Sequence, residues 1–325
     1  MNIAAGGSTG SGDGLPREEP EAPLTEGSDS RLDDMGSGWP ELVEPVMVAA
    51  FEGWNDAGDA ATGAVEHLEL VWDAEPLTEI DPDDYYDFQV NRPTVSQVDG
   101  VSRRVTWPTT RLSFCRPPRA DFDVVFVRGI EPNMRWRGFC RELLALITEL
   151  DVRTVVTRAA LLSGAPHTRP TQDTGTAHDS DSAVRYRLDK SRYEGPTGIV
   201  GVLQDACVGA GIPSVSFWAG VPHYVSQPPN PKATLALLHS VEEVLDLPIP
   251  LAELPQQSDE WQKLVDEMAA EDDEVIEYIR NLEERDDELD RPELSAASGD
   301  MIAREFERYL RRRDRRGPGH GTGRG

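Results

Sequence analysis

An apolar run, a polar turn and a helical pattern follow one another without a gap near the start of the ordered-looking part of the chain. Residues 46–51 form a continuous apolar run of the length expected for a buried strand. Gly53 and Gly58 bound a short polar turn, and apolar residues then recur at helical spacing from Asp59 to Val71. The pattern predicts a strand, a tight turn and a helix, which together are half of a βαβ unit.

The same kind of alternation continues to about residue 250. Strands are predicted over residues 122–127, 152–157 and 213–218, and helices over residues 135–150, 199–210 and 231–245. Because strands alternate with helices, we expect parallel pairing, right-handed crossovers and a three-layer α/β/α sandwich. Two further β-rich pieces, residues 103–107 and 110–115, are split by Pro108 and predict a hairpin or edge pair. Residues 171–181 read as a polar loop.

The two ends of the chain differ from this core, which we place at residues 41–250. Residues 1–40 are rich in Gly, Ser, Pro, Asp and Glu, a composition that predicts a disordered tail. Residues 251–314 carry helix formers at a period near 3.6 and many acidic side chains, which predicts an appended helical segment with a last helix over residues 300–313. Residues 315–325 are Gly-rich and are predicted to be disordered.

Charge and composition exclude several classes of function. The chain has 59 acidic and 32 basic residues and a formal net charge of -27, so nucleic acid is not an expected partner, because phosphate contacts need a basic face. No apolar stretch reaches the roughly 20 residues that cross a bilayer, and the first residues lack a signal-peptide pattern, so we expect a cytoplasmic protein without a membrane partner. Cys115, Cys140 and Cys207 lack metal-site spacing, so no metal is expected.

The turn after the first strand is the first candidate site. Ligands of open α/β sheets bind outside the carboxyl ends of the strands. Glu52, Asn55 and Asp56 lie at such an end and at a helix start, and Glu131 follows the next long apolar strand. Helix capping alone would also explain Asn55 and Asp56. The turn has neither the lysine of a P-loop nor the three-glycine spacing of a dinucleotide site, so no cofactor is expected.

Two proline-histidine pairs supply the second candidate group. His167 and His223 each follow a predicted core strand, where a histidine can act as a general base or a proton-switched ligand, and Arg169 is available for an anion. The alternative is that each ring caps a loop carbonyl while the prolines stiffen the turn. Tyr193 and Glu194 begin a Gly-rich turn at a helix start, where backbone amides can cradle an anion. The predicted pocket therefore contains Glu52, Asn55, Asp56, Glu131, His167, Arg169, Tyr193, Glu194 and His223.

The sequence contains no recognisable catalytic constellation. No serine lies in a nucleophile-elbow pattern, no cysteine has a context that would activate it, and no histidine and carboxylate cluster has metal-ligand spacing. These patterns disfavour a covalent hydrolase or a metalloenzyme. The catalytic residues, if there are any, are not identified by sequence.

Several separated motifs together resemble one known family. They are residues 51–58 (Phe-Glu-Gly-Trp-Asn-Asp-Ala-Gly), 85–88 (Tyr-Tyr-Asp-Phe) with 91–93 (Asn-Arg-Pro), 166–170 (Pro-His-Thr-Arg-Pro), 193–198 (Tyr-Glu-Gly-Pro-Thr-Gly) and 222–224 (Pro-His-Tyr). Over about residues 45–290 the chain resembles the actinobacterial branch of the PAC2 family, named for proteasome assembly chaperone 2. The resemblance implies a fold similar to purine nucleoside phosphorylases, a cytoplasmic location, self-association and kinship with chaperones that help assemble the 20S proteasome.

Three hypotheses on function follow. The first is a non-catalytic, homo-oligomeric PAC2-type protein with an assembly or chaperone role and with proteasome subunits as candidate partners. The second is a small-molecule-binding protein, or a phosphorylase-like or hydrolase-like enzyme, that uses the crevice at the carboxyl edge of the sheet. The third is an adaptor that acts through the acidic C-terminal helices.

Overall fold

A computed structural model describes residues 39–98, 102–177, 179–191 and 193–289. Most of the predicted N-terminal tail, the predicted helix over residues 300–313 and the predicted C-terminal tail lie outside these described residues. The main sheet has the strand order β2-β5-β6-β1-β7-β10-β8-β9. Its strands are β1 (Val46–Glu52), β2 (Glu75–Glu79), β5 (Thr110–Cys115), β6 (Val124–Ile130), β7 (Thr154–Ser163), β8 (Asp173–Ala177), β9 (Asp189–Lys190) and β10 (Ser214–Pro222). The α-helices are α1 (Ala60–Val71), α2 (Trp136–Glu149), α3 (Ser180–Tyr186), α4 (Ile199–Gly209), α5 (Pro231–Leu245), α6 (Leu254–Ala269) and α7 (Asp273–Leu289).

The four central strands are parallel. β1 pairs with β6 on one side and with β7 on the other, so that Val46 lies opposite both Val124 and Thr154. β7 in turn pairs with β10. These strands are apolar on both faces because helices cover both faces, which is the pattern of a buried parallel sheet.

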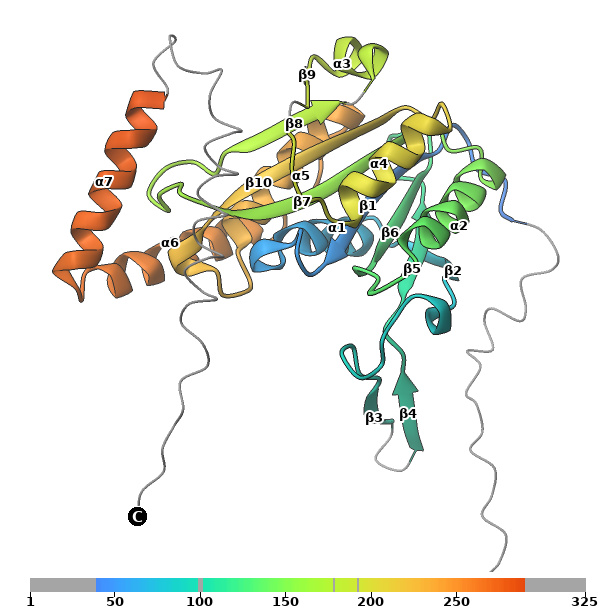
Figure 1. Ribbon diagram of the computed structural model, residues 1–325, viewed down its shortest axis with the longest axis horizontal. Coiled ribbons are helices and arrows are strands. Elements are labelled where there is room, and N and C mark those ends of the chain that lie inside the picture. The colour runs from blue at the N-terminus through green and yellow to red at the C-terminus, as the bar shows by residue number, and fades with distance from the viewer. Residues whose placement is uncertain (1–38, 99–101, 178, 192, 290–325) are drawn as a thin grey trace, which may run out of the picture. The chain divides into compact units, whose positions relative to one another are not determined.

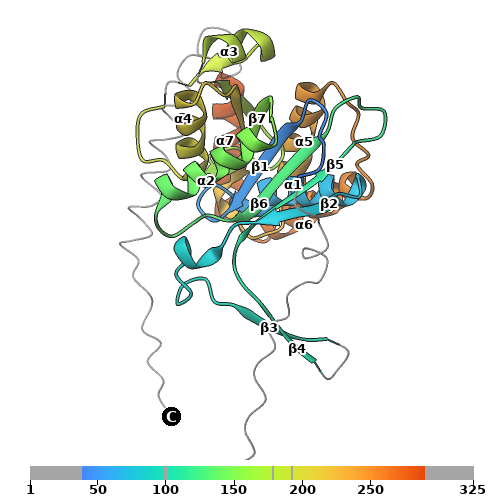
Figure 2. The ribbon, with the colours of Figure 1, turned by 90° about the vertical axis from the view of Figure 1, so that its right-hand side faces the viewer.

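Two hydrophobic cores lie on opposite faces of the sheet and define three layers (Figures 1 and 2). Successive side chains of a strand point to opposite faces. On β1, Val48 and Ala50 therefore pack in the core formed with α1 and α5, whereas Met47 and Ala49 pack in the core formed with α2 and α4. The predicted three-layer α/β/α sandwich is confirmed.

The sheet is mixed rather than wholly parallel, which corrects part of the expectation. β5 is antiparallel to β6, β2 is antiparallel to β5, and β8 is antiparallel to β10. β8 falls inside residues 171–181, which the sequence pattern assigns to a polar loop. Its five residues include Gly175 and two threonines rather than an apolar run, because this strand lies near the edge of the sheet.

The hairpin predicted across Pro108 is also wrong. Residues Ser102–Thr106 (β4) pair with Thr94–Val98 (β3) in a separate two-stranded sheet, and β5 instead joins the main sheet between β2 and β6. Pro108 separates these two pairings, because it has no N–H to continue a ladder.

Helices α6 and α7 follow the sandwich, as the helical periodicity predicted. α6 buries Val265 and Ala269, and α7 buries Ile279 and Leu282, while the acidic side chains of both helices are largely exposed. α6 packs against α5. Among the described residues, no helix combines the length and apolar character needed to span a membrane.

Candidate functional site

The first turn holds the start of α1. Both backbone N–H groups of Ala61 and Thr62 donate to one carboxylate oxygen of Asp56, at 2.7 and 3.2 Å, and the Thr62 hydroxyl donates to the other oxygen. These are the groups that a helix N-terminus leaves without intrahelical partners. The N-cap position of α1 is Asp59, whose side chain forms no capping hydrogen bond, so the side chain of Asp56 caps the helix from three positions earlier.

Burial changes the acidity of this cap. Asp56 is 4% exposed. Loss of hydration raises the pKa of Asp56 to about 6, although the hydrogen bonds from Thr62 and Ala61 oppose the rise. A buried carboxyl group of this kind is also what a general base requires. Here, however, its two oxygens already accept three hydrogen bonds from the helix that it caps.

Glu131 plays the corresponding part at α4. One of its carboxylate oxygens accepts a hydrogen bond from the backbone N–H of Ile199 at 2.8 Å and from the side-chain amide of Asn55 at 3.3 Å. Burial raises the pKa of Glu131, while the backbone hydrogen bonds from Ile199 and Trp54 lower it. The start of α4 is the place where the Gly-rich turn predicted an anion site. The chain's own carboxylate occupies that place.

Gly198 makes this contact possible. A Cβ atom at Gly198 would lie 2.0 Å from the side-chain nitrogen of Asn55 and 2.8 Å from a carboxylate oxygen of Glu131. The absence of a side chain therefore lets the turn before α4 approach the turn after β1. Asn55 itself is buried, and its backbone carbonyl accepts a hydrogen bond from Ala160 of β7 at 2.7 Å.

The other predicted residues of this edge are more exposed. Glu52 ends β1 and its backbone carbonyl accepts the N–H of Glu131 at 3.0 Å, which ties β1 to the end of β6. Tyr193 folds over its own turn, where its hydroxyl donates to the carbonyl of Pro196 at 2.8 Å. Glu194 is exposed beside it. Tyr193 therefore holds the conformation of the Gly-rich turn that leads into α4.

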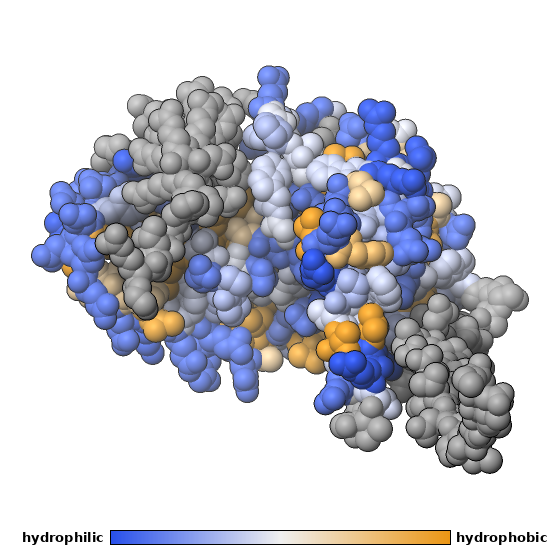
Figure 3. Space-filling model, turned by 60° about the horizontal axis from the view of Figure 1, so that its bottom comes forward, coloured by the Kyte–Doolittle hydropathy of each residue, from blue (hydrophilic) through white to orange (hydrophobic). Residues whose placement is uncertain are grey.

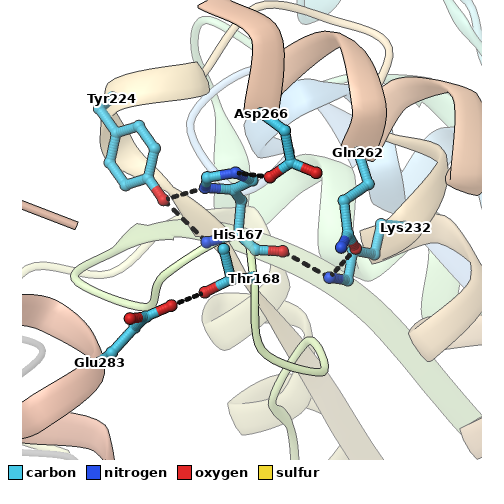
Figure 4. A network of polar contacts seen from close by, with 7 residues as sticks. All are labelled: His167, Thr168, Tyr224, Lys232, Gln262, Asp266 and Glu283. Carbon is cyan, nitrogen blue, oxygen red and sulfur yellow. Dashed lines mark hydrogen bonds and ion pairs between the residues drawn. The ribbon is translucent and has the colours of Figure 1, made fainter. Parts of the chain in front are cut away.

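His167 binds α6 (Figure 4). Its Nε2 atom lies 2.9 Å from Oδ1 of Asp266, and its Nδ1 atom lies 2.7 Å from the hydroxyl of Tyr224. The Nε2–H group donates to the carboxylate, since a carboxylate only accepts. The carbonyl of His167 accepts from the ammonium group of Lys232 at 2.5 Å, and Lys232 also donates to Gln262 of α6. His167 is 2% exposed and thus forms the centre of a docking contact between the core and α6.

His223 binds α7 in a comparable way. Its Nδ1 atom donates to the carbonyl of Ser163 at 2.9 Å, and its Nε2 atom lies 2.9 Å from the hydroxyl of Tyr278 on α7. Since Nδ1 carries the donated proton, Nε2 of the neutral ring accepts from the Tyr278 hydroxyl. The ring thus caps a loop carbonyl, as one of the two interpretations predicted, and it also contacts the appended helix.

Further contacts extend this docking along α7. Arg169 forms two hydrogen bonds with the carboxylate of Asp287, at 2.8 and 3.0 Å, and Thr168 donates to Glu283 (Figure 4). Gln172 donates to Asp286 at 2.8 Å. Arg169 therefore binds an acidic side chain of the same chain at the place where an external anion was considered.

The structure divides the predicted pocket into two groups. Asp56 and Glu131 cap α1 and α4, and Asn55 donates to Glu131, while His167, Arg169 and His223 contact α6 and α7. The two groups are linked through the start of α5, where Asn230 donates its N–H to the carbonyl of Gly58 at 2.8 Å and Lys232 binds the carbonyl of His167. The sequence places both groups on the same edge of the sheet, but it does not show that they bind different helices.

A groove lies next to the first turn, beside β5 and β6. Its volume is about 460 Å³. Glu52 lines it together with three arginines, Arg92, Arg111 and Arg128. Arg128 is paired with Glu69 at 2.8 Å and Arg111 with Glu79 at 3.4 Å. Sequence reasoning missed the arginines of this groove, because it paired the segment of Arg111 with residues 103–107, whereas β5 lies between β2 and β6.

Arg158 is a buried charge in the middle of β7. It is fully buried, its guanidinium carbon lies 4.4 Å from the ring centroid of Phe217, and it donates to the hydroxyl of Ser240 on α5 at 2.7 Å. Burial lowers the pKa of Arg158 to about 9, and the neighbouring Asp173 opposes this change. Arg158 therefore links β7 to α5 inside one core rather than at the carboxyl edge.

Sequence reasoning also missed the acidic partners of the histidine loops. Asp266, Glu283, Asp286 and Asp287 belong to a segment in which nearly every turn carries an acidic residue, so sequence alone does not distinguish the docked positions. Tyr278 was a usable signal, because it lies three positions after Val275 and four before Leu282 and so shares the apolar face of the helix. Across the described ranges, no three His, Cys, Asp or Glu side chains are grouped as metal ligands would be.

Comparisons with known proteins agree with these motifs and this fold. The model of the PAC2 family matches residues 50–269. A PAC2 family protein from Streptomyces avermitilis is 59% identical, with a TM-score of 0.69, and the match covers 72% of this chain and 99% of that one. A proteasome-assembly chaperone homologue from Mycobacterium tuberculosis is 61% identical, with a TM-score of 0.67 and the same two coverages, 72% and 99%.

A more distant structure has the same arrangement. A Mycobacterium tuberculosis protein described as of unknown function is 27% identical, with a TM-score of 0.69, and the match covers 77% of this chain and 89% of that one. No functionally curated protein matches the chain. The family model spans the first turn, both histidine loops and α6, and two relatives share well over half of the aligned residues. The chain belongs to the PAC2 family.

Proposed function

We propose that this chain is a non-catalytic assembly protein of the PAC2 type, which associates with itself and has proteasome subunits as partners. The proposal rests on what the polar side chains at the carboxyl edge of the sheet bind. Asp56 and Glu131 cap helices, and the rings of His167 and His223 bind α6 and α7 through Asp266 and Tyr278. The groups best suited to acid-base chemistry are thus used to hold the fold and its C-terminal helices together.

The partner class is suggested by a relative. The Mycobacterium tuberculosis protein that is 61% identical to this chain is described as a proteasome-assembly chaperone homologue. An assembly chaperone acts through surfaces, so it needs a rigid scaffold more than a reactive pocket. The docking of α6 and α7 on the sandwich supplies such a scaffold.

Affinity capture tests this proposal. Tagged full-length protein is incubated with an actinobacterial lysate at native salt, and the bound proteins are identified by mass spectrometry. We expect proteasome α or β subunits to be enriched over a control with an unrelated acidic protein of similar charge. If no proteasome subunit is recovered, the proteasome part of the proposal is wrong.

The groove beside β5 supports a second candidate function, the binding of an anionic small molecule. The groove is lined by Arg92, Arg111 and Arg128, and guanidinium groups bind carboxylates and phosphates. A thermal-shift panel of phosphates, carboxylates and nucleosides tests this function. A true ligand at a hundredfold excess over its dissociation constant stabilises the fold by about 2.7 kcal/mol. The loss of that shift in Arg92→Ala would place the ligand in the groove, and no shift with any compound would reject this function.

A further inference from the structure

The β3–β4 hairpin is an exposed, basic surface on an acidic protein. Residues 88–116 contain five arginines and one acidic residue, whereas the whole chain has a net charge of -27. Arg103 and Arg104 lie on β4, all five residues of which are exposed. Within the described residues, neither arginine forms an ion pair. The hairpin therefore carries positive charge that forms no ion pair with any residue the structure describes.

The hairpin also exposes apolar side chains. Val95 and Val105 lie directly opposite each other across the two strands and are 58% and 48% exposed. Arg103, two positions from Val105, points to the same face. A two-stranded sheet on its own is only marginally stable in water. Next to the hairpin, the rings of Phe88 and Trp107 pack against each other, with their centroids 4.8 Å apart.

A second surface of the chain has the opposite charge. We call residues 264–277, from the end of α6 to the start of α7, the acidic elbow. Leu264, Met268 and Ile276 are exposed apolar residues on it, at 56%, 49% and 38%. Exposed acidic residues surround them, among them Glu267 and Glu271. Figure 3, coloured by hydropathy, shows small apolar groups among hydrophilic residues over one face of the molecule.

The two surfaces belong to opposite ends of the sheet. The hairpin lies between β2 and β5 in the chain, and these strands are neighbours at one end of the strand order. The helices of the elbow are docked on the loops after β7 and β10, towards the other end, through His167 and His223. The central strands of the sheet separate them. The hairpin and the elbow of one chain are therefore far from each other along the sheet. Each is complementary in charge to the opposite surface of a second chain.

We propose that the β3–β4 hairpin of one copy docks on the acidic elbow of a second copy. Val95 and Val105 pack on Leu264 and Met268, and Arg103, on the same face, lies among the acidic side chains of the elbow. Arg104, on the other face of the hairpin, adds to its positive charge. Each copy then has one donor surface and one acceptor surface, so the contact is head-to-tail and forms a ring if it closes. This inference rests on the self-association in the proposed function and does not require a proteasome partner.

Charge reversal tests the pairing of the two surfaces. Full-length protein with Arg103→Glu and Arg104→Glu, and protein with Glu267→Arg and Glu271→Arg, are compared by sedimentation velocity over a concentration series. We expect each pair of substitutions to weaken self-association by about tenfold or more, as the loss of close charge pairs does at other interfaces. Combining all four substitutions in one chain should restore association. Circular dichroism and thermal unfolding show whether each variant is folded.

Cysteine crosslinking tests the geometry. Val95→Cys and Leu264→Cys are introduced singly and together, while the three native cysteines are buried and their thiol pKa values are raised to about 11 or 12 by that burial. Mild oxidation should give covalent oligomers when both new cysteines are present. Efficient crosslinking of Val95→Cys alone would show hairpin-to-hairpin contact and overturn the proposal.

The remaining outcomes are also decisive. Association that is lost in the hairpin variant but unchanged in the elbow variant would place another occupant on the hairpin and overturn the proposal. A stable oligomer that neither reversal affects would overturn this interface and leave self-association standing. A wild-type protein that stays monomeric at every concentration would overturn both this interface and the self-association in the proposed function, without bearing on proteasome contact.

Discussion

The carboxylate of Glu131 accepts a hydrogen bond of 2.8 Å from the backbone N–H of Ile199, so the chain itself supplies the negative group at the start of α4. Helix N-termini bind anions through free N–H groups and the helix dipole. At α4 one of these groups is already bound to Glu131, and Asn55 holds the same carboxylate oxygen. This edge of the sheet is therefore held by internal caps.

Replacing Glu131 by alanine should open an anion site. The Ile199 N–H and the Asn55 amide lose their acceptor, which should lower the free energy of unfolding by about 1–3 kcal/mol. Acetate should then stabilise the variant more than the wild type, because it restores a carboxylate. Thermal unfolding with and without acetate measures both effects. Glu194→Ala removes an equal charge from an exposed position of the neighbouring turn, and an equal loss of stability there would contradict the capping role.

Gly198→Ala should disturb the same contact from the opposite side. The added Cβ would lie 2.0 Å from the Asn55 side-chain nitrogen, so the side chains of Asn55 and Glu131 must move away from the start of α4. Gly209→Ala is a matched control, because a Cβ there meets nothing within 4 Å and Gly209 ends the helix that Gly198 precedes. We expect a lower unfolding temperature for Gly198→Ala alone. Equal unfolding temperatures in the two variants would show that the approach of the two turns is not tight.

The buried cap Asp56 should make stability depend on pH. Its pKa is raised from 3.8 to about 6 in the folded protein, so the folded state binds a proton more tightly than the unfolded state between about pH 4 and pH 6. The contribution of the protonated Asp56 carboxyl group to the free energy of unfolding is therefore fully present below about pH 4. It is lost as the pH rises through about 6. The shift in the pKa of Asp56 corresponds to a decrease in the free energy of unfolding on the order of 3 kcal/mol.

Asp56→Asn tests this linkage, because asparagine keeps a carbonyl oxygen for the cap but does not titrate. Urea unfolding of both proteins from about pH 4 to pH 7 should show the variant gaining stability relative to the wild type as the pH rises. Asp205→Asn, at an exposed position of α4, controls for the change of net charge. Two parallel stability curves for Asp56→Asn and wild type would contradict the raised pKa of Asp56.

Loss of His167 should loosen α6. His167→Ala removes the partner of Asp266 and of the Tyr224 hydroxyl inside a buried contact. Hydrogen exchange should become faster over residues 254–269, while β1 remains protected, because local opening needs less free energy than global unfolding. His239→Ala is the control, since His239 is an exposed histidine on α5. Unchanged exchange in α6 would show that the helix is held without His167.

Arg158 should be costly to remove and simple to replace. Arg158→Ala leaves a cavity and takes a positive charge away from Asp173, and breaking a buried charged contact costs about 3–5 kcal/mol. The double variant Arg158→Leu with Asp173→Asn replaces both charges and should unfold close to wild type, because uncharged cores of similar volume are as stable. Chemical unfolding compares the three proteins. A double variant as unstable as Arg158→Ala would show that the buried charge itself stabilises the core.

The layered fold was predictable because its signals are local. The apolar runs of β1 and β6 and the helical spacing of α1 and α5 each occur within a few turns of chain, and they identify both the elements and the two-sided burial of the sheet. The antiparallel edges were not predictable in the same way. β8 is a short strand without an apolar run, and its antiparallel partner β10 is distant in sequence, so local pattern alone does not identify it.

The structure places the candidate residues after the strands that the sequence predicts, but sequence alone did not show their contacts. Asp56 and Glu131 were identified from their places after β1 and β6. Sequence could not show that Glu131 reaches the N-terminus of α4, because that contact spans 68 residues. The partner of His167 is 99 residues away on α6, among many equivalent acidic residues.

The assembly role is tested most directly by adding the purified protein to recombinant actinobacterial proteasome α and β subunits and following assembly by native mass spectrometry. The proposed function predicts a complex between this chain and free α subunits or an assembly intermediate, a faster rise of 20S particles, and no copy of the chain in the finished particle. If no complex forms and the rate of assembly is unchanged, the proposed role as a proteasome assembly protein is wrong.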